Sequence, residues 1–244
     1  RRFVKRWRTR SVEWEPARLL GIAVQVGLSR SLRGGTEQAI EQGVVDEITA
    51  GFEEQPKYTR EGLIKLALRG VEAALEKDLF HRHAILMVDE PLAHSRPDVV
   101  SRHETEGLGV TDFKVSHSVN ERYRAQRLSS YETEDQFWHY AWEVGETLGE
   151  PVQWVRPVLI ILSPKATVLT ESIRVRPERL SFWLEGAEQH WQDMAAEDRG
   201  ERPTMPRWPS CRGGRFGACE AYDYCHILDR DPVKATLYYE EITT

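Results

Sequence analysis

Two carboxylates and a lysine lie at the edges of two short apolar runs in the middle of the chain. Asp98 precedes Val99–Val100, and Asp112 and Lys114 follow the run Leu108–Thr111, two residues apart. Residues i and i+2 of a strand point to the same face, so Asp112 and Lys114 should lie side by side, with Asp98 on a neighbouring strand. Two carboxylates can bind a hard divalent cation, and an adjacent lysine can hold a water or stabilise a phosphorane-like transition state. The set predicts phosphodiester cleavage; a surface hairpin with solvated charges is the alternative.

The composition fits one globular domain with a sizeable core. The chain has 244 residues, of which 40% are hydrophobic and 30% charged, and a net charge of −6. It has no apolar run of about 18 residues, so we expect no transmembrane helix and no membrane partner. The negative total argues mildly against a protein that coats nucleic acid, although local patches decide a binding face. Three cysteines are too few for a secreted disulfide framework, and we expect a cytoplasmic protein.

The apolar periodicity predicts helices around a sheet. Spacings of three and four residues predict helices at 17–51, divided at 33–35 with Thr36 as N-cap, and at 59–77, 132–148 and 177–196. Apolar runs predict strands at 83–92, 97–100, 107–115 and 155–162, with a weakly alternating outer strand at 167–175. We therefore expect an α/β fold in which helices flank a central mixed β-sheet, followed by a C-terminal Cys-rich loop.

Three motifs in this order resemble a known family. They are Arg96-Pro97-Asp98-Val99-Val100, Gly109-Val110-Thr111-Asp112-Phe113-Lys114-Val115-Ser116 and Gln136-Phe137-Trp138-His139-Tyr140-Ala141-Trp142. Together they resemble the PD-(D/E)XK nuclease superfamily, and most closely its RecB-like exonuclease branch with the phage-type and the iron–sulfur CRISPR-associated members. The resemblance runs from about Gly21 to about Cys225. It implies a restriction-endonuclease-like core and a Mg²⁺- or Mn²⁺-dependent deoxyribonuclease.

The resemblance also implies roles for further residues. The family's Gln-x-x-x-Tyr motif matches Gln136 and Tyr140, which share a helix face and would support the lysine, a phosphate or the DNA backbone. The backbone carbonyl of Phe113 would be a metal ligand. The family's Gly-x-x-x-His motif matches Gly21 to Gln25, so an amide replaces the imidazole ligand. An amide oxygen can still ligate a cation, more weakly, and the preference could shift from Mn²⁺ towards Mg²⁺.

Two basic segments are candidates for contacts with DNA. In the family, the loop after the catalytic strand borders the DNA channel, and residues 119–130 hold Arg122, Arg124 and Arg127 there. Residues 1–10 hold six basic residues interleaved with two aromatic ones, a pattern that could follow phosphates while a ring stacks on a base. The alternatives are a solvated loop and an exposed basic helix.

Three cysteines occupy a Gly- and Pro-rich segment near the C-terminus. Cys211, Cys219 and Cys225 suggest a metal nest, which His226 could complete as a zinc site; free thiols are a further alternative. Iron–sulfur members of the resembled branch place one Cys before the first helix and three near the C-terminus, which implies a structural [4Fe–4S] cluster. No Cys precedes residue 211, so its fourth ligand would lie upstream of Arg1; the sequence does not begin with Met, and we expect preceding residues.

Together these features predict a nuclease core with an N-terminal helical region at 1–202 and a Cys-rich segment at 203–244 that packs back on the N-terminal helices. We expect a metal-dependent DNA nuclease, preferentially an exonuclease on single-stranded or frayed ends; the exonuclease mode comes from the resemblance. DNA is the expected partner, and the resemblance suggests proteins of recombination, phage or CRISPR-adaptation machinery, which no residue of the sequence identifies. The alternatives are a non-catalytic DNA-binding or recruitment subunit with the same fold, and a metal-cluster protein unrelated to DNA.

Overall fold

The computed structural model describes residues 7–9, 16–53, 57–117, 131, 134–199, 201 and 239–241. The chain divides into two compact units. The larger comprises Glu15–Trp183, and the smaller is made of Arg1–Trp14 and Leu184–Thr244. Within the described ranges, no helix combines the length and the apolar character needed to cross a membrane.

Three helices open the larger unit where the periodicity predicts them: α1 (Pro16–Leu32), α2 (Glu37–Gly51) and α3 (Arg60–Glu76). Threonine side chains cap two of them. The hydroxyl of Thr36 accepts the N–H of Ala39 at 3.2 Å, and that of Thr59 accepts the N–H of Gly62 at 3.1 Å. Each bond satisfies one of the N–H groups that the first turn of a helix leaves without a partner.

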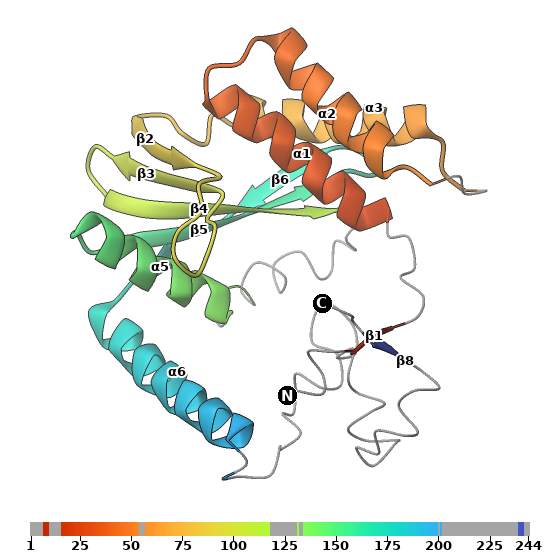
Figure 1. Cartoon of the computed structure of the whole chain (residues 1–244). Coiled ribbons are helices and arrows are strands. Elements are labelled where there is room, and N and C mark those ends of the chain that lie inside the picture. Colours follow the sequence, from red (N-terminus) through yellow and green to blue (C-terminus); the bar gives the residue numbers. More distant parts are fainter. Residues whose placement is uncertain are drawn as a thin grey trace. The chain divides into compact units, whose positions relative to one another are not determined.

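A mixed sheet forms the centre of the larger unit, as predicted (Figure 1). Its strand order is β2–β3–β4–β5–β6, and β7 also pairs with β5. The strands are β2 (His83–Val88), β3 (Val99–His103), β4 (Gly107–Ser116), β5 (Trp154–Ile161), β6 (Thr167–Thr170) and β7 (Ile173–Arg174). Strands β4 and β5 are parallel, while the other described pairs of this sheet are antiparallel.

The edges of β2 and β3 differ from the predicted ranges. Strand β2 ends at Val88 rather than at residue 92, because Asp89 adopts a positive φ of 52° and turns the chain. The N–H of Asp89 then donates to the carbonyl of Asp98 at 2.8 Å, which closes the connecting loop at its base. Strand β3 begins at Val99 rather than at residue 97, so Asp98 lies immediately before the strand. The predicted outer strand at 167–175 is divided into β6 and β7.

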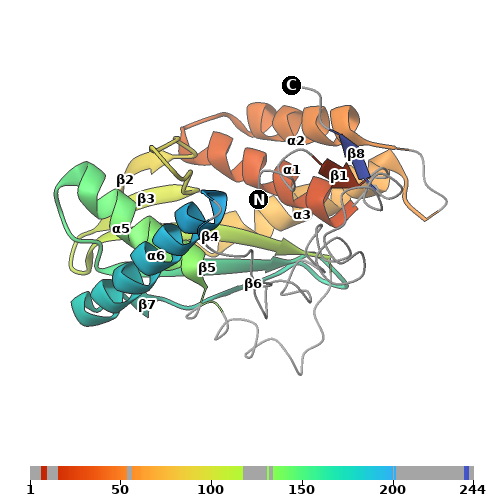
Figure 2. The ribbon, with the colours of Figure 1, turned by 60° about the horizontal axis from the view of Figure 1, so that its bottom comes forward.

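Helices cover both faces of the sheet (Figures 1 and 2). On one face, α3 approaches β5 so closely that a side chain at Gly70 would meet Ile160 and Leu162. On the other face lies α5 (Asp135–Leu148), which ends at Gly149 with a positive φ of 65°. The α6 helix (Pro177–Asp198) follows β7, and its Trp183 donates to Asp135 at the start of α5.

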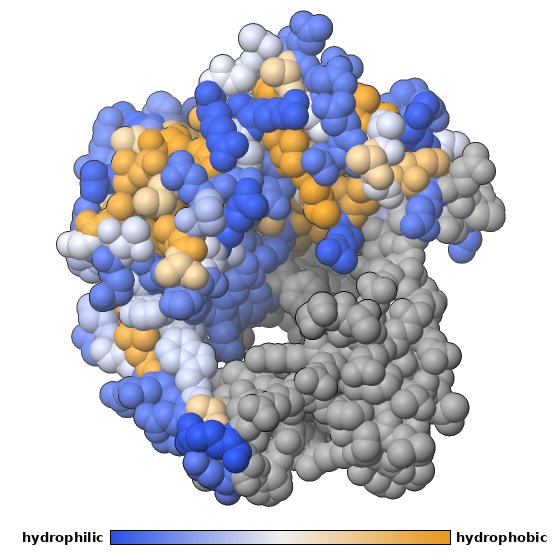
Figure 3. All heavy atoms as spheres, viewed as in Figure 1, coloured by the Kyte–Doolittle hydropathy of each residue, from blue (hydrophilic) through white to orange (hydrophobic). Residues whose placement is uncertain are grey.

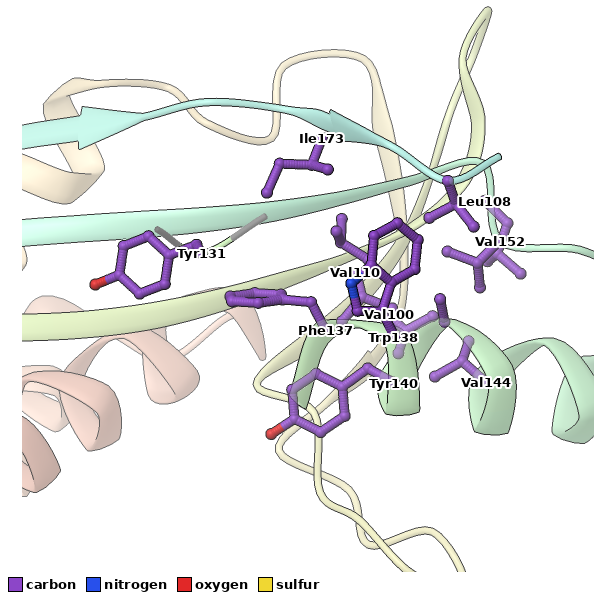
Figure 4. Close-up of a cluster of buried hydrophobic side chains, with 13 residues drawn as sticks. Val100, Leu108, Val110, Tyr131, Phe137, Trp138, Tyr140, Val144, Val152 and Ile173 are labelled. Atoms are coloured by element: carbon purple, nitrogen blue, oxygen red, sulfur yellow. The ribbon is translucent and has the colours of Figure 1, made fainter. Parts of the chain in front are cut away.

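The core between α5 and the sheet is built on alternating strand residues. Leu108 and Val110 of β4 belong to one buried cluster with the rings of Phe137 and Trp138 from α5 (Figure 4). Because strand side chains alternate, Asp112 and Lys114 continue the same face beyond this apolar part. The core therefore ends where the charged residues begin, and it fixes α5 beside them.

Gly109 should tolerate no side chain, because a Cβ there would overlap the indole of Trp154 on β5. We expect Gly109→Ala to lower the free energy of unfolding by about 3 kcal/mol, since the overlap forces the ring or the strand to move. Urea unfolding followed by circular dichroism measures the change. The matched control is Gly145→Ala in α5, where the nearest atom, the carbonyl oxygen of Glu150, is 3.5 Å away. That variant should be as stable as the wild type or more so, and equal losses in both would contradict the prediction.

The smaller unit contains a two-stranded antiparallel sheet. Strand β1 (Trp7–Thr9) pairs with β8 (Tyr239–Glu241), and Trp7 lies opposite Glu241. This pairing joins segments that lie more than 200 residues apart in the sequence.

The described surface of the larger unit carries both hydrophilic and hydrophobic areas. On the face seen in Figure 3, hydrophobic side chains gather over β2 and along α1, and hydrophilic ones surround them. Leu86 of β2 and Ile22 of α1 are among the large apolar side chains that are more than one third exposed.

Candidate functional site

Strand β4 presents Asp112 and Lys114 side by side, as the two-residue spacing predicts. The Nζ atom of Lys114 lies 2.7 Å from Oδ2 of Asp112. Asp112 is only 2% exposed, and both residues lie where β4 is paired with β5, opposite Pro157 and Leu159. The described ladder with β3 ends one residue earlier, at Thr111, so the ion pair lies just beyond the end of β3 pairing.

Asp98 reaches the same place from the start of β3. In the β3–β4 ladder Val99 pairs with Thr111, and the next step of that register brings Asp98 opposite Asp112. Asp98 is 6% exposed, and its Oδ2 accepts the backbone N–H of Phe113 at 2.6 Å. Its other oxygen accepts a hydrogen bond from the Nε2 of Gln25.

The two carboxylates, Asp98 and Asp112, form an electrostatically unfavourable pair unless a further positive charge is present. Burial raises the pKa of Asp98 to about 7, and the Asp112 carboxylate adds to the rise. The N–H of Phe113 and the ammonium of Lys114 oppose it without cancelling it. Two carboxylates and one ammonium leave a net charge of −1 when all three are ionised, and a buried negative charge favours either a proton or a cation.

Gln136 joins the helix to the strand. From the first turn of α5, its Oε1 accepts from the Nζ of Lys114 at 2.8 Å, and its Nε2 donates to Oδ1 of Asp112 at 3.0 Å. The same Nε2 lies 2.6 Å from the hydroxyl oxygen of Tyr140, one turn later. One amide thereby orients the ammonium and the carboxylate together.

Tyr140 extends the network to the loop before β3. It is buried, and its hydroxyl lies 3.4 Å from the carbonyl oxygen of Arg96, a long contact for a hydrogen bond. Burial, followed by the negative charge of Asp112, raises the pKa of Tyr140 above its ordinary value. The phenol therefore stays protonated and serves as a hydrogen-bond donor.

Gln25 reaches the site from α1. It lies one turn after Gly21, where an added Cβ would lie 4.0 Å from the Cβ of Val115 on β4, an ordinary packing distance that places α1 against this strand. This approach allows the Gln25 amide to contact Asp98. The Gln25 side chain thus lies at the carboxylate of Asp98, with its N–H₂ group turned towards it.

The donor set fits a hard cation rather than zinc. Asp98, Asp112, the amide oxygen of Gln25 and the carbonyl of Phe113 are all oxygen donors, and Mg²⁺ typically binds one or two carboxylates and keeps several waters. Across the described ranges, no cluster of three or more His, Cys, Asp or Glu residues has the arrangement of a metal site. A cation here would therefore depend on the two carboxylates and on water, as Mg²⁺ does.

A further acidic side chain near the site was not predicted. Asp89 lies close enough to Asp98 to raise the pKa of that carboxyl slightly. The guanidinium of Arg96 holds Asp89, with its Nε 2.7 Å from Oδ1 and its Nη2 2.8 Å from Oδ2. The signal available in the sequence was an Asp at the end of an apolar run, a position that favours a turn.

The remaining predicted site residues fall outside the described ranges. They are the candidate DNA-contacting residues Arg122, Arg124 and Arg127 and the candidate cluster ligands Cys211, Cys219 and Cys225. Their roles stay predictions.

Comparisons with known proteins yield structural similarity only. No protein-family model matches the chain, and no curated protein matches it significantly. A candidate exonuclease from Eubacterium rectale is similar in structure, with a TM-score of 0.43 and 16% identity over 79% of this chain and 71% of that one. The alkaline exonuclease LHK-Exo from Laribacter hongkongensis has a TM-score of 0.29 and 14% identity, over 74% of this chain and 98% of its own. The dAMP complex of LHK-Exo has a TM-score of 0.29 and 12% identity, over 78% and 99%.

Proposed function

We propose that this protein is a metal-dependent nuclease that hydrolyses phosphodiester bonds of DNA at Asp98, Asp112 and Lys114. One observation carries the proposal: two carboxylates, each at least nine-tenths buried, share a site in which Lys114 supplies the one ammonium among the described residues. Burial of unbalanced like charges costs free energy, and proteins accept this cost mainly where a cation or a reaction uses it. The order of the three sequence motifs supports a nuclease over other metal-dependent hydrolases.

Four oxygen donors would hold the cation: Asp98, Asp112, the carbonyl of Phe113 and the amide of Gln25. When bound, a divalent cation supplies charge neutralisation for the scissile phosphate and lowers the pKa of an attacking water. Gln25 now donates to Asp98, so its amide would have to turn to present its oxygen. The hydrogen bond from the Phe113 N–H to Asp98 would not have to break, because it uses the carboxylate oxygen that Gln25 does not contact.

Lys114 would act on the reacting groups directly. Its ammonium is fixed between Asp112 and Gln136, so it needs little reorganisation to orient a water or to stabilise charge that develops on the phosphate. Gln136 and Tyr140 would keep the lysine and the loop before Asp98 in position. These roles make Lys114 a catalytic residue and Gln136 a positioning residue.

The finer assignments rest on the sequence motifs. Exonuclease action on single-stranded or frayed DNA follows from the resemblance to the RecB-like branch. Phosphate contacts by Arg122, Arg124 and Arg127 and a [4Fe–4S] cluster on Cys211, Cys219 and Cys225 complete the proposal. Anaerobic purification tests the cluster, since a brown protein with absorbance at roughly 400 nm would carry it and a colourless one would not.

Cleavage of labelled DNA tests the proposed function. The protein is incubated with single-stranded, blunt and frayed substrates, labelled at either end, with Mg²⁺, Mn²⁺ or a chelator. We expect degradation with either cation and none with the chelator. Asp112→Asn, prepared in the same way, identifies a contaminating nuclease, because activity from this site must disappear in that variant. Absence of cation-dependent cleavage on every substrate would contradict the proposal.

Gln25→His should shift the cation preference. An imidazole nitrogen binds Mn²⁺ better than Mg²⁺, so we expect the affinity for Mn²⁺ relative to Mg²⁺ to rise about tenfold. Titration calorimetry with each cation gives the ratio. Gln42→His on the exposed surface of α2 is the matched control and should leave it unchanged. An unchanged ratio in Gln25→His would remove Gln25 from the proposed ligand set.

A further inference from the structure

A buried carboxylate on α5 lies outside the proposed catalytic set. Glu143 is 4% exposed and lies three residues after Tyr140. Its Oε1 accepts the backbone N–H of His94 at 2.6 Å, and its Oε2 lies 3.3 Å from the Nε2 of His139. Burial alone would raise the pKa of Glu143, but the nearby hydroxyl of Ser95, the hydrogen bond from the His94 N–H and the neighbouring imidazole of His139 lower it. Glu143 is therefore a charged acceptor inside the protein.

The partner of Glu143 belongs to the loop that leads into Asp98. This loop connects β2 to β3 and passes over α5 (Figure 1). It is closed at its base by the bond from Asp89 N–H to the carbonyl of Asp98. Its middle is bound to α5 at two points, the contact of Tyr140 with the Arg96 carbonyl and the bond of Glu143 with His94.

The two attachments differ in strength. The Tyr140 contact is 3.4 Å long, near the limit for a hydrogen bond. The Glu143 bond is 2.6 Å long and charge-assisted, a class of bond about twice as strong as one between neutral groups. Glu143 thus makes the stronger of these two hydrogen-bonded attachments, and Leu92 of the same loop adds apolar packing against the cluster that contains α5.

The loop would matter more to Asp98 with a cation in the proposed site. In this structure the side chain is held by Phe113 N–H and by Gln25. If Gln25 is a ligand, as proposed, its amide would turn and one of these two restraints would be lost. The position of the Asp98 backbone, set by the loop, would then decide how well the two carboxylates share a cation.

We propose that Glu143 is a positioning residue that anchors the loop between β2 and β3 to α5 and so sets Asp98 for cation binding. The inference rests on the proposed function, in which Asp98 and Asp112 hold the cation. Residues that orient a ligand through a hydrogen bond typically change metal affinity by ten- to a hundredfold when they are replaced. Glu143 acts through the backbone rather than on the ligand side chain, so the lower end of that range applies.

Four variants separate this role from simple packing. Glu143→Leu removes the acceptor, and Glu143→Asp shortens it by one methylene while it keeps the charge, which provides a second variant if the first fails to fold. Glu143→Gln keeps an oxygen in place for the His94 N–H. Glu146→Leu, on the exposed side of the same helix, is the matched control for the loss of a helical carboxylate.

Two readouts are independent of DNA cleavage. Titration calorimetry with Mn²⁺ should show about tenfold weaker binding for Glu143→Leu and Glu143→Asp, and near wild-type binding for Glu143→Gln and Glu146→Leu. Amide hydrogen exchange of the metal-free proteins should be faster at residues 90–97 only in the first two variants. Wild-type Mn²⁺ affinity in both Glu143→Leu and Glu143→Asp would overturn the inference. A wild-type protein that binds no Mn²⁺ would instead overturn the proposed function, which tells the two failures apart.

Discussion

Lys114→Met should lower kcat for DNA cleavage by about a hundredfold to a thousandfold while Mn²⁺ binding is kept or becomes tighter. The methionine retains most of the apolar stem, whereas the ammonium that it removes lies 6.0 Å from the centre of the Phe137 ring. It removes the ammonium that would orient the water or stabilise the phosphate. Loss of this positive charge beside Asp112 also removes a repulsion on the cation, so metal affinity should not fall. Turnover thus falls while metal affinity does not.

Single-turnover cleavage of end-labelled DNA and titration calorimetry with Mn²⁺ measure the two quantities. Lys65→Met, on the exposed side of α3, is the matched control and should keep both values. Equal cleavage by Lys114→Met and the wild type would remove Lys114 from the reaction. Loss of cleavage together with loss of metal would make it a structural residue of the cation site.

Asp98→Asn should abolish cleavage and yet stabilise the metal-free protein at pH 8. The pKa of Asp98 is raised to about 7 from an ordinary 3.8, so the folded protein holds this proton more tightly than the unfolded chain does. The stabilisation that this bound proton gives to the folded protein is fully present below about pH 4 and is lost as the pH rises through about 7. At pH 8 the wild type therefore carries the full cost of the buried charge, which asparagine does not. We expect Asp98→Asn to gain about 2 kcal/mol at pH 8 and little at pH 4.

The hydrogen bonds of the site make this substitution tolerable. Asparagine keeps an oxygen for the Phe113 N–H, and its N–H₂ can donate to Gln25 if that amide turns over. Urea unfolding in a chelator at both pH values measures the gain, and Asp46→Asn on the surface of α2 serves as the control. Mn²⁺ should raise the melting temperature of the wild type and not that of Asp98→Asn. A variant that is no more stable than the wild type at pH 8 would contradict the charge argument.

The parts of the site that the sequence predicts correctly are those that depend on the short-range periodicity of strands and helices. The spacing of Asp112 and Lys114 matches the two-residue repeat of a strand, and that of Gln136 and Tyr140 matches one helical turn. Both pairs lie together, as expected. The mixed sheet and the flanking helices follow from the same apolar periods.

The parts that periodicity could not predict depend on long-range contacts or on special backbone conformations. The turn at Asp89 needs a positive φ that a non-glycine residue rarely adopts, so the strand was expected to continue. The contact of Gln25 with Asp98 spans 73 residues and follows from the sequence only through a family motif. From the sequence alone, Glu143 would be expected to be a charged side chain exposed to solvent on the helix surface. It borders the apolar stripe of Phe137, Tyr140 and Val144.

The parallel pairing of β4 with β5 has a consequence for the order of folding. A parallel neighbour cannot be reached by a tight hairpin turn, so the chain has to cross the sheet first, and α5 forms part of this return path. Asp112 and Lys114 precede the crossing and Gln136 lies within it, whereas Asp98 joins from the antiparallel hairpin of β2 and β3 with β4. The hairpins can form from nearby residues, but the lysine is held on both sides only after the slower crossover has closed. A partly folded chain would thus contain both carboxylates before it contains an ordered Lys114.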